Sequence, residues 1–147
     1  IGGGVIGLTI ARKFAKKNGN TLLIEKNNKL GQETSLRNSA VIHSGVYYPS
    51  NFLKTKLCID GRKKLIFFCK KKNIRYKKTG KLIIANTKEE FKKLFLIKTN
   101  SDLNISNKKD KVLLLDKLGT QKLEPNINCY GSIYSPSSGI LDLCSQS

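Results

Sequence analysis

Three glycines near the start of the chain have the spacing of a phosphate-binding turn. Gly2, Gly4 and Gly7 form the pattern G-x-G-x-x-G and open a stretch with helical apolar spacing. The first glycine permits a tight turn, the second lets the backbone approach a pyrophosphate, and the third lets the helix pack closely on a sheet. Amides at the start of that helix can then bind phosphates, because the helix dipole is positive there. The turn predicts a dinucleotide cofactor.

An acidic residue follows at the distance where such folds contact a ribose. Glu25 lies 18 residues after Gly7 and closes the apolar run Thr21–Glu25, which we predict to be a buried parallel strand. Its carboxylate can accept hydrogen bonds from ribose hydroxyls and would repel the 2′-phosphate of NADP. We count the neighbouring Lys26 among the candidate cofactor-binding residues. The turn and Glu25 favour NAD or FAD and do not choose between them.

The elements around the turn follow from hydrophobic spacing. An amphipathic helix is predicted from Ile6 to Ala15, and Asn18-Gly19-Asn20 ends it because these residues tolerate the left-handed conformation of a C-cap. Residues 29–50 show no sustained period, and such long irregular segments in compact domains are usually functional. The order turn, helix, strand is most of a βαβ unit.

The rest of the chain alternates between helical and strand-like patterns. A helix is predicted over 53–72 and strands over 81–85 and 112–115. Thr87 and Glu90 form a capping box that opens a further helix. Glu124-Pro125 breaks the chain, and residues 131–141 contain a strand and a Ser-Pro-Ser-Ser-Gly turn.

Charge and cysteine content restrict the other functional classes. The net charge is +18, but only four of the 28 basic residues are Arg, which argues against specific nucleic-acid recognition and leaves peripheral membrane association open. No C-x-x-C pair is present and there is one His, so no metal site is expected. Cys58 and Cys69 share one face of the predicted helix, as inert core thiols do. No apolar run approaches the length needed to span a bilayer.

The segment Thr34–Pro49 favours FAD over NAD, because it resembles a family of flavoproteins. It is similar to the D-amino-acid-oxidase-type flavoproteins, and its run R-N-S-x-V-I-H-x-G-x-Y-Y-P closely resembles L-2-hydroxyglutarate dehydrogenases and oxidases. Further matches continue along the whole chain through Gly61-Arg62, residues 80–85, Leu123-Glu124-Pro125 and residues 135–142.

The resemblance implies an FAD enzyme that oxidises the α-hydroxyl of a small 2-hydroxy acid, L-2-hydroxyglutarate, to 2-oxoglutarate, with oxygen or a quinone as electron acceptor. His43 is then the candidate base or flavin-side orienting group, since an imidazole titrates near neutral pH. Tyr47 can donate to a substrate carboxylate, although tyrosines before a proline also serve packing. The remaining candidate FAD-binding residues are Thr34, Ser35, Arg37, Asn38, Ser39 and Gly45.

The expected fold class is α/β, with a Rossmann-like FAD-binding domain over residues 1–78. Residues 79–147 would begin an antiparallel-sheet α+β substrate domain, with a return to the FAD domain near the C-terminus as one option. The chain begins at Ile1 directly before the glycine turn and has no Met, so we expect a fragment whose first strand is truncated. A cytoplasmic location or one peripheral to an inner membrane is expected.

Two other functions are compatible with the sequence. Another oxidase or dehydrogenase of the same superfamily, acting on glycerol-3-phosphate or an amino acid, would share the glycine turn and a histidine-containing flavin segment. A non-catalytic basic binding protein on this fold would use the lysine-rich surface instead.

Overall fold

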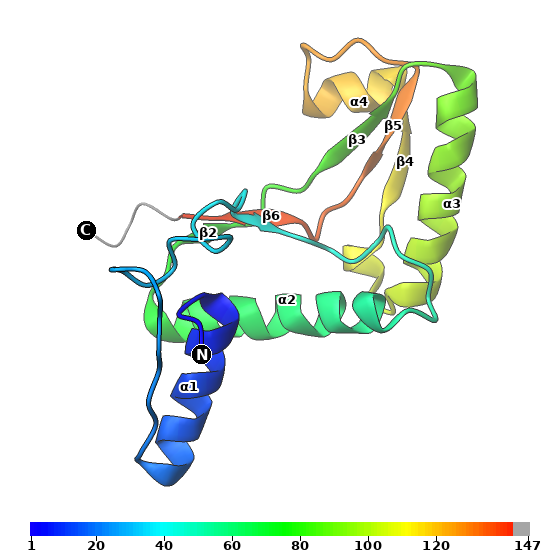
Figure 1. The fold of residues 1–147 in the computed structure, drawn as a ribbon. Helices are drawn as coiled ribbons and strands as arrows, with labels where there is room; N and C mark the ends of the chain where they lie inside the picture. Colours follow the sequence, from blue (N-terminus) through cyan, green and yellow to red (C-terminus); the bar gives the residue numbers. More distant parts are fainter. Residues whose placement is uncertain (143–147) are drawn as a thin grey trace. The chain divides into compact units, whose positions relative to one another are not determined.

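A computed structural model describes residues 1–142 of the chain, which divides into two compact units, the first being Ile1–Ser39 and the second beginning at Ala40 (Figure 1). The expected border between an FAD-binding and a substrate domain at residue 78 stays a prediction.

The first unit is built around one helix. Helix α1 spans Val5–Asn18, begins directly after Gly4, and ends at Gly19, whose amide donates to the Ala15 carbonyl at 3.1 Å. Gly19 has a φ of +74°, which glycine adopts without steric cost. Lys16 and Lys17 occupy the last turn, where cations complement the helix dipole. The predicted helix and its glycine end are confirmed.

The expected strand over Thr21–Glu25 is absent, and this prediction was wrong. A β-strand requires a ladder of backbone hydrogen bonds to a neighbour. Within residues 1–142 one backbone hydrogen bond joins this run to another segment, from the Gly2 amide to the Ile24 carbonyl at 2.7 Å. The run is apolar, as a buried strand would be, but strand formation depends on a partner segment that the run itself does not specify.

Between residues 40 and 142, the second unit holds two antiparallel sheets of three strands each. In the first sheet, β6 (Gly139–Leu141) lies between β1 (Val41–Ile42) and β2 (Tyr76–Lys77). In the second, β5 (Gly131–Tyr134) lies between β3 (Leu82–Ala85) and β4 (Leu113–Asp116), as Figure 1 shows. The strands predicted over 81–85 and 112–115 are confirmed within one residue. The two-residue strands β1 and β2 were not predicted, because they are too short to show alternation.

Four helical elements accompany these sheets. Helix α2 spans Leu53–Lys72, as predicted, and α3 spans Lys88–Asn104. Thr87 caps this helix as predicted, since its hydroxyl accepts from the Glu90 amide at 3.2 Å, while the Glu90 carboxylate accepts from the Asn86 amide at 2.7 Å and not from that of Thr87. The short elements η1 (Lys108–Asp110) and α4 (Lys117–Leu123) were not predicted.

The core of the second unit lies where α3 packs on the sheet of β3, β5 and β4. Ile133 of the central strand β5 is fully buried and pairs with Ile83 on one side and Leu114 on the other. Apolar side chains from both neighbouring strands and from α3 therefore converge on one central residue. The other buried members of this cluster are Val46, Ala85, Leu94, Ile105 and Val112.

Candidate functional site

The glycine turn has the backbone geometry that its sequence predicted. Gly2 has a φ of +95°, a backbone conformation that residues other than glycine rarely adopt. At Gly7 a Cβ would lie 1.9 Å from the Gly2 carbonyl oxygen, so a side chain there cannot be accommodated without moving the backbone. The glycine turn and the first turn of α1 are therefore in close contact, which requires glycine at position 7, while the positive φ favours glycine at position 2.

Glu25 holds the turn from the other side. Its Oε2 accepts from the Gly3 amide at 2.5 Å and its Oε1 accepts from the Asn27 amide at 2.9 Å. These two hydrogen bonds lower the pKa of Glu25 below its ordinary value of 4.5, and the hydrogen bond from Asn27 has the larger effect. The group is therefore an anion at neutral pH. Each carboxylate oxygen has a second lone pair with which it can accept from a ligand hydroxyl.

A cavity of about 290 Å³ opens in front of these residues. Of the predicted cofactor-binding residues, Gly2, Gly4, Glu25 and Lys26 line it together. The ammonium group of Lys26 pairs with Glu33 at 3.2 Å across exposed surface. The remaining lining residues are Ile1, Gly31, Gln32 and Glu33.

Ser35 connects the irregular segment to the start of the helix. Its Oγ accepts from the Val5 amide at 2.9 Å, which satisfies one of the first-turn amides that have no acceptor inside the helix. A Cβ on Gly4 would lie 3.1 Å from the same oxygen. The Ser35 carbonyl in turn accepts from Asn38 Nδ2 at 2.6 Å. Ser35 and Asn38 therefore order the backbone beside the cavity.

The other predicted residues of this segment do not line the cavity. Thr34 and Arg37 form a turn in which the Arg37 amide donates to the Thr34 carbonyl at 3.2 Å, and both are exposed, as is Ser39. Their cofactor contacts stay predictions.

The residues of the first unit fit the ADP half of a dinucleotide. Gly2 and Gly4 contribute no side chain to the cavity wall, and Glu25 presents an anionic acceptor there. No acidic residue occupies the first turn of α1, so the positive end of the helix dipole is not neutralised there. This is the arrangement that binds a pyrophosphate and a ribose.

The second unit contains the predicted catalytic residues in one segment after β1. His43 follows this strand directly and is exposed, while its carbonyl accepts from the Cys58 thiol at 3.8 Å. Gly45 has a φ of +83°, and a Cβ there would lie 2.8 Å from Ile59 Cγ1 of α2. The structure therefore provides a reason for this glycine that does not involve the cofactor, and its approach to a flavin stays a prediction.

Tyr47 is half-buried against the hydrophobic core of the second unit. Its ring packs edge-on to Tyr48 at a centroid distance of 6.5 Å, and Lys81 Nζ lies 5.1 Å from its ring centroid. The Tyr47 hydroxyl is buried and has no hydrogen-bond partner among residues 1–142. The ring therefore serves packing, while the hydroxyl keeps a donor that the described residues do not use.

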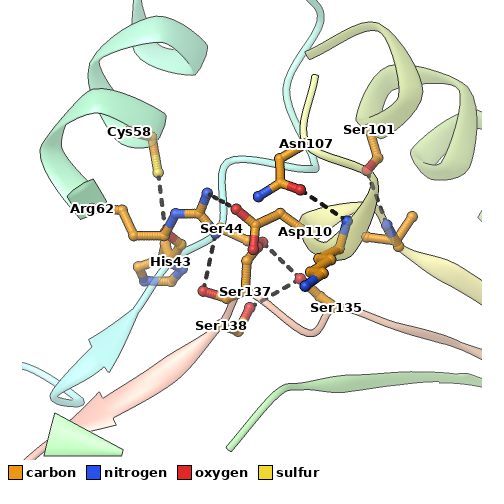
Figure 2. A network of polar contacts seen from close by, with 12 residues as sticks. His43, Ser44, Cys58, Arg62, Ser101, Asn107, Asp110, Ser135, Ser137 and Ser138 are labelled. Carbon is orange, nitrogen blue, oxygen red and sulfur yellow. Dashed lines mark hydrogen bonds and ion pairs between the residues drawn. The ribbon is translucent and has the colours of Figure 1, made fainter. Parts of the chain in front are cut away.

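A polar network beside His43 was not predicted from the sequence (Figure 2). Arg62 of α2 is 6% exposed and its guanidinium contacts the Ser137 carbonyl and the Asp110 carboxylate. Ser44 and Ser135, both buried, are joined by a hydrogen bond of 2.9 Å. The hydrophobic periodicity of a sequence indicates which apolar residues are buried, so it does not indicate that a serine is buried. The burial of Arg62 could have been predicted, because positions 58, 62, 65 and 69 have the spacing of one helix face.

The two helical cysteines behave as expected for packing residues. Cys69 is 1% exposed and Cys58 is half-buried, and desolvation raises the pKa of both thiols. In residues 1–142 we find no cluster of three His, Cys, Asp or Glu side chains that could hold a metal ion. Within the same range no helix is both long and apolar enough to cross a membrane.

The glycine turn, the anionic Glu25 and the cavity between them define a dinucleotide-binding unit of the Rossmann class. Comparison with known proteins assigns it further. The chain belongs to the family of FAD-dependent oxidoreductases, whose profile matches residues 1–144. The expected α/β flavoprotein fold and the FAD cofactor are thereby confirmed.

Among its relatives are proteins named L-2-hydroxyglutarate dehydrogenase. The mitochondrial protein of Arabidopsis thaliana is 39% identical over 142 residues, and that of Homo sapiens is 34% identical over 144. Each alignment covers 97% of this chain and, respectively, 29% and 30% of the relative. The chain thus spans about a third of the length of such relatives.

Solved structures show the same fold. An L-α-glycerophosphate oxidase from Mycoplasma pneumoniae with FAD bound superposes with a TM-score of 0.83 at 33% identity, over 96% of this chain and 37% of that one. A glycine oxidase from Geobacillus kaustophilus has a TM-score of 0.80 at 21% identity, over 95% and 39% of the two chains. The second likeness concerns the fold alone.

Proposed function

We propose that this chain is part of an FAD-dependent dehydrogenase or oxidase that converts L-2-hydroxyglutarate to 2-oxoglutarate. One observation carries the choice of substrate, namely the 34–39% identity to L-2-hydroxyglutarate dehydrogenases over 97% of the chain. When bound, FAD supplies the two-electron acceptor that takes hydride from the α-carbon of the hydroxy acid.

The chain's own residues bind the cofactor in this proposal. The first-turn amides of α1 that Ser35 does not occupy bind the pyrophosphate, with the helix dipole behind them. Glu25 accepts from the ribose hydroxyls, because its two amide hydrogen bonds already keep it anionic and fixed beside the cavity. Ser35 keeps the segment after the acid against the start of α1. Thr34, Arg37 and Ser39 remain available for further cofactor contacts.

His43 is the proposed base for the substrate hydroxyl. Its imidazole is exposed, while its backbone is anchored by β1 and by Cys58, so the ring stands on a fixed support and can reach a ligand. It would take the hydroxyl proton as the α-hydrogen leaves with its electron pair. The unused Tyr47 hydroxyl is a second candidate donor, toward a substrate carboxylate.

The test uses the full-length protein with His43→Ala. We expect it to retain bound flavin and to lose flavin reduction by L-2-hydroxyglutarate by about 100-fold or more in stopped flow. Lys64→Met, which removes an exposed cation from α2, is the matched control and should reduce at the wild-type rate. Reduction of the His43→Ala protein at a near-normal rate would remove the base assignment. A wild-type flavin that L-2-hydroxyglutarate does not bleach would reject the function itself.

A second substrate class has specific support. The structure at 33% identity is named an L-α-glycerophosphate oxidase, so glycerol-3-phosphate is the alternative hydroxylated substrate. Anaerobic titration of the flavin with each compound in turn separates the two. Oxygen uptake against reduction of a soluble quinone during the same turnover then identifies the electron acceptor, for which we propose oxygen or a quinone.

A further inference from the structure

One face of helix α2 supports the His43 segment. Cys58, Ile59 and Arg62 occupy neighbouring positions on it, since residues four apart lie one turn above each other. The Cys58 thiol donates to the His43 carbonyl, and Ile59 packs where Gly45 leaves no room for a side chain. The third residue of this face, Arg62, makes its hydrogen bonds to Ser137 and Asp110.

Arg62 instead holds the turn between β5 and β6. Its Nη1 donates to the Ser137 carbonyl at 3.2 Å, and its Nη2 lies 3.3 Å from Asp110 Oδ2. The side chain of Arg62 is 5% exposed, so this cation is held almost entirely by protein groups. A buried guanidinium constrains its partners strongly, because without the Asp110 carboxylate its charge would be buried without an opposite charge, and without the Ser137 carbonyl it would lose a hydrogen bond.

The turn held by Arg62 is linked to the residue after His43 by buried hydroxyls. Ser138 Oγ donates to Ser135 Oγ at 3.1 Å, and Ser135 Oγ donates to Ser44 Oγ at 2.9 Å. All three serines are at most 2% exposed. Figure 2 shows the contacts of Arg62 with Ser137 of this turn and with Asp110, and the Ser138–Ser135–Ser44 hydrogen bonds that lead from the turn to the residue after His43.

The same turn leads into the strand that pairs with β1. Ile42, the residue before His43, lies opposite Gly139 in the ladder of β1 and β6. A Cβ on Gly139 would lie 2.4 Å from the Lys77 carbonyl oxygen, so this part of β6 is closely packed. The residues on both sides of His43 are therefore held by the same part of the chain. Ile42 pairs with Gly139, directly after the 135–138 turn, and Ser44 is hydrogen-bonded to Ser135 within it.

We propose that Arg62 is a positioning residue for His43 and acts through the Ser137 carbonyl and the Ser135–Ser44 hydrogen bond. This inference rests on the proposed function in that His43 is the group whose position matters for the reaction. Arg62 does not touch substrate or cofactor in this proposal. It holds the turn that holds the histidine backbone.

The first experiment measures this constraint without any turnover. Amide hydrogen exchange is compared in the full-length wild type, Arg62→Met and Ser135→Ala, with Lys64→Met as the control on the exposed face of the same helix. We expect exchange in peptides 41–46 and 135–142 to rise about tenfold in the first two variants and to stay unchanged over 88–104. Unchanged exchange at 41–46 in both variants would overturn the proposal. Ser135→Ala removes a single hydroxyl and keeps the test valid if Arg62→Met does not fold.

The second experiment asks whether Arg62 acts through His43. The rate constant of flavin reduction by L-2-hydroxyglutarate is measured for Arg62→Met, His43→Ala and the double variant. We expect about a tenfold loss for Arg62→Met alone and no further loss when His43 is already alanine. Equal losses in both backgrounds, or a wild-type rate for Arg62→Met, would overturn the positioning role. Failure of the wild type to react would reject the proposed substrate, and the exchange data would still decide the role of Arg62.

Discussion

Replacing Gly7 by alanine tests whether the glycine turn binds the cofactor. A Cβ at this position would lie 1.9 Å from the Gly2 carbonyl oxygen, and the nearest atom is backbone, which cannot rotate away. The two segments must separate by about 1.5 Å to restore an ordinary contact of 3.4 Å. Inserting a methyl group into such a contact costs about 1–3 kcal/mol.

The displaced residue is part of the candidate site itself. Gly2 lines the cavity beside Glu25, and its amide donates to the Ile24 carbonyl at 2.7 Å. A misplacement of more than 1 Å in a positioned contact can cost about 100-fold. We therefore expect Gly7→Ala in the full-length protein to raise the dissociation constant of FAD by about 100-fold, or about 2.7 kcal/mol.

The assay is titration of the apoprotein with FAD followed by flavin fluorescence, together with thermal unfolding. Gly61→Ala is the matched control, because a Cβ there meets nothing within 4 Å and the residue lies inside α2. Helix propensity predicts that this control stabilises the protein by up to about 1 kcal/mol and leaves FAD affinity unchanged. A Gly7→Ala protein that binds FAD within about threefold of wild type would refute the assignment of the turn.

Three further predictions concern particular residues. The pKa of Glu25 is lowered in the folded state. The contribution of this carboxylate to stability is therefore complete above its unfolded pKa of 4.5 and is lost as the pH falls through the lowered pKa. The affinity for FAD, measured by titration, should weaken in that same acidic range, and Glu25→Gln should abolish this pH dependence. Gly45→Ala should destabilise the protein by about 1–2 kcal/mol, because residue 45 has a φ of +83°, and a melting temperature equal to wild type would contradict this. Thr87→Ala should cost about 1 kcal/mol in denaturant unfolding through loss of the hydroxyl that accepts from the Glu90 amide, whereas Thr99→Ala, in the interior of the same helix, should cost less.

The elements that could be predicted from the sequence are those formed by interactions between residues close together in the chain. The limits of α2 and the start of α3 depend on side-chain spacing and on a cap within a few residues, so short stretches of sequence contain the necessary information. The glycine turn is local in the same sense, because Gly2 and Gly7 are constrained by each other. Glu25 was found by its distance along the chain from that turn.

What the sequence determined by itself was therefore the cofactor turn, its acid, and a histidine segment that resembles one enzyme family. Only the tertiary structure decided that Thr21–Glu25 forms no strand, since a strand exists only through hydrogen bonds to a partner. It also decided that Arg62 is buried and hydrogen-bonded to the carbonyl of Ser137, 75 residues away in the chain. Hydroxyls and charges become buried only where distant partners satisfy them, and no local pattern specifies those partners.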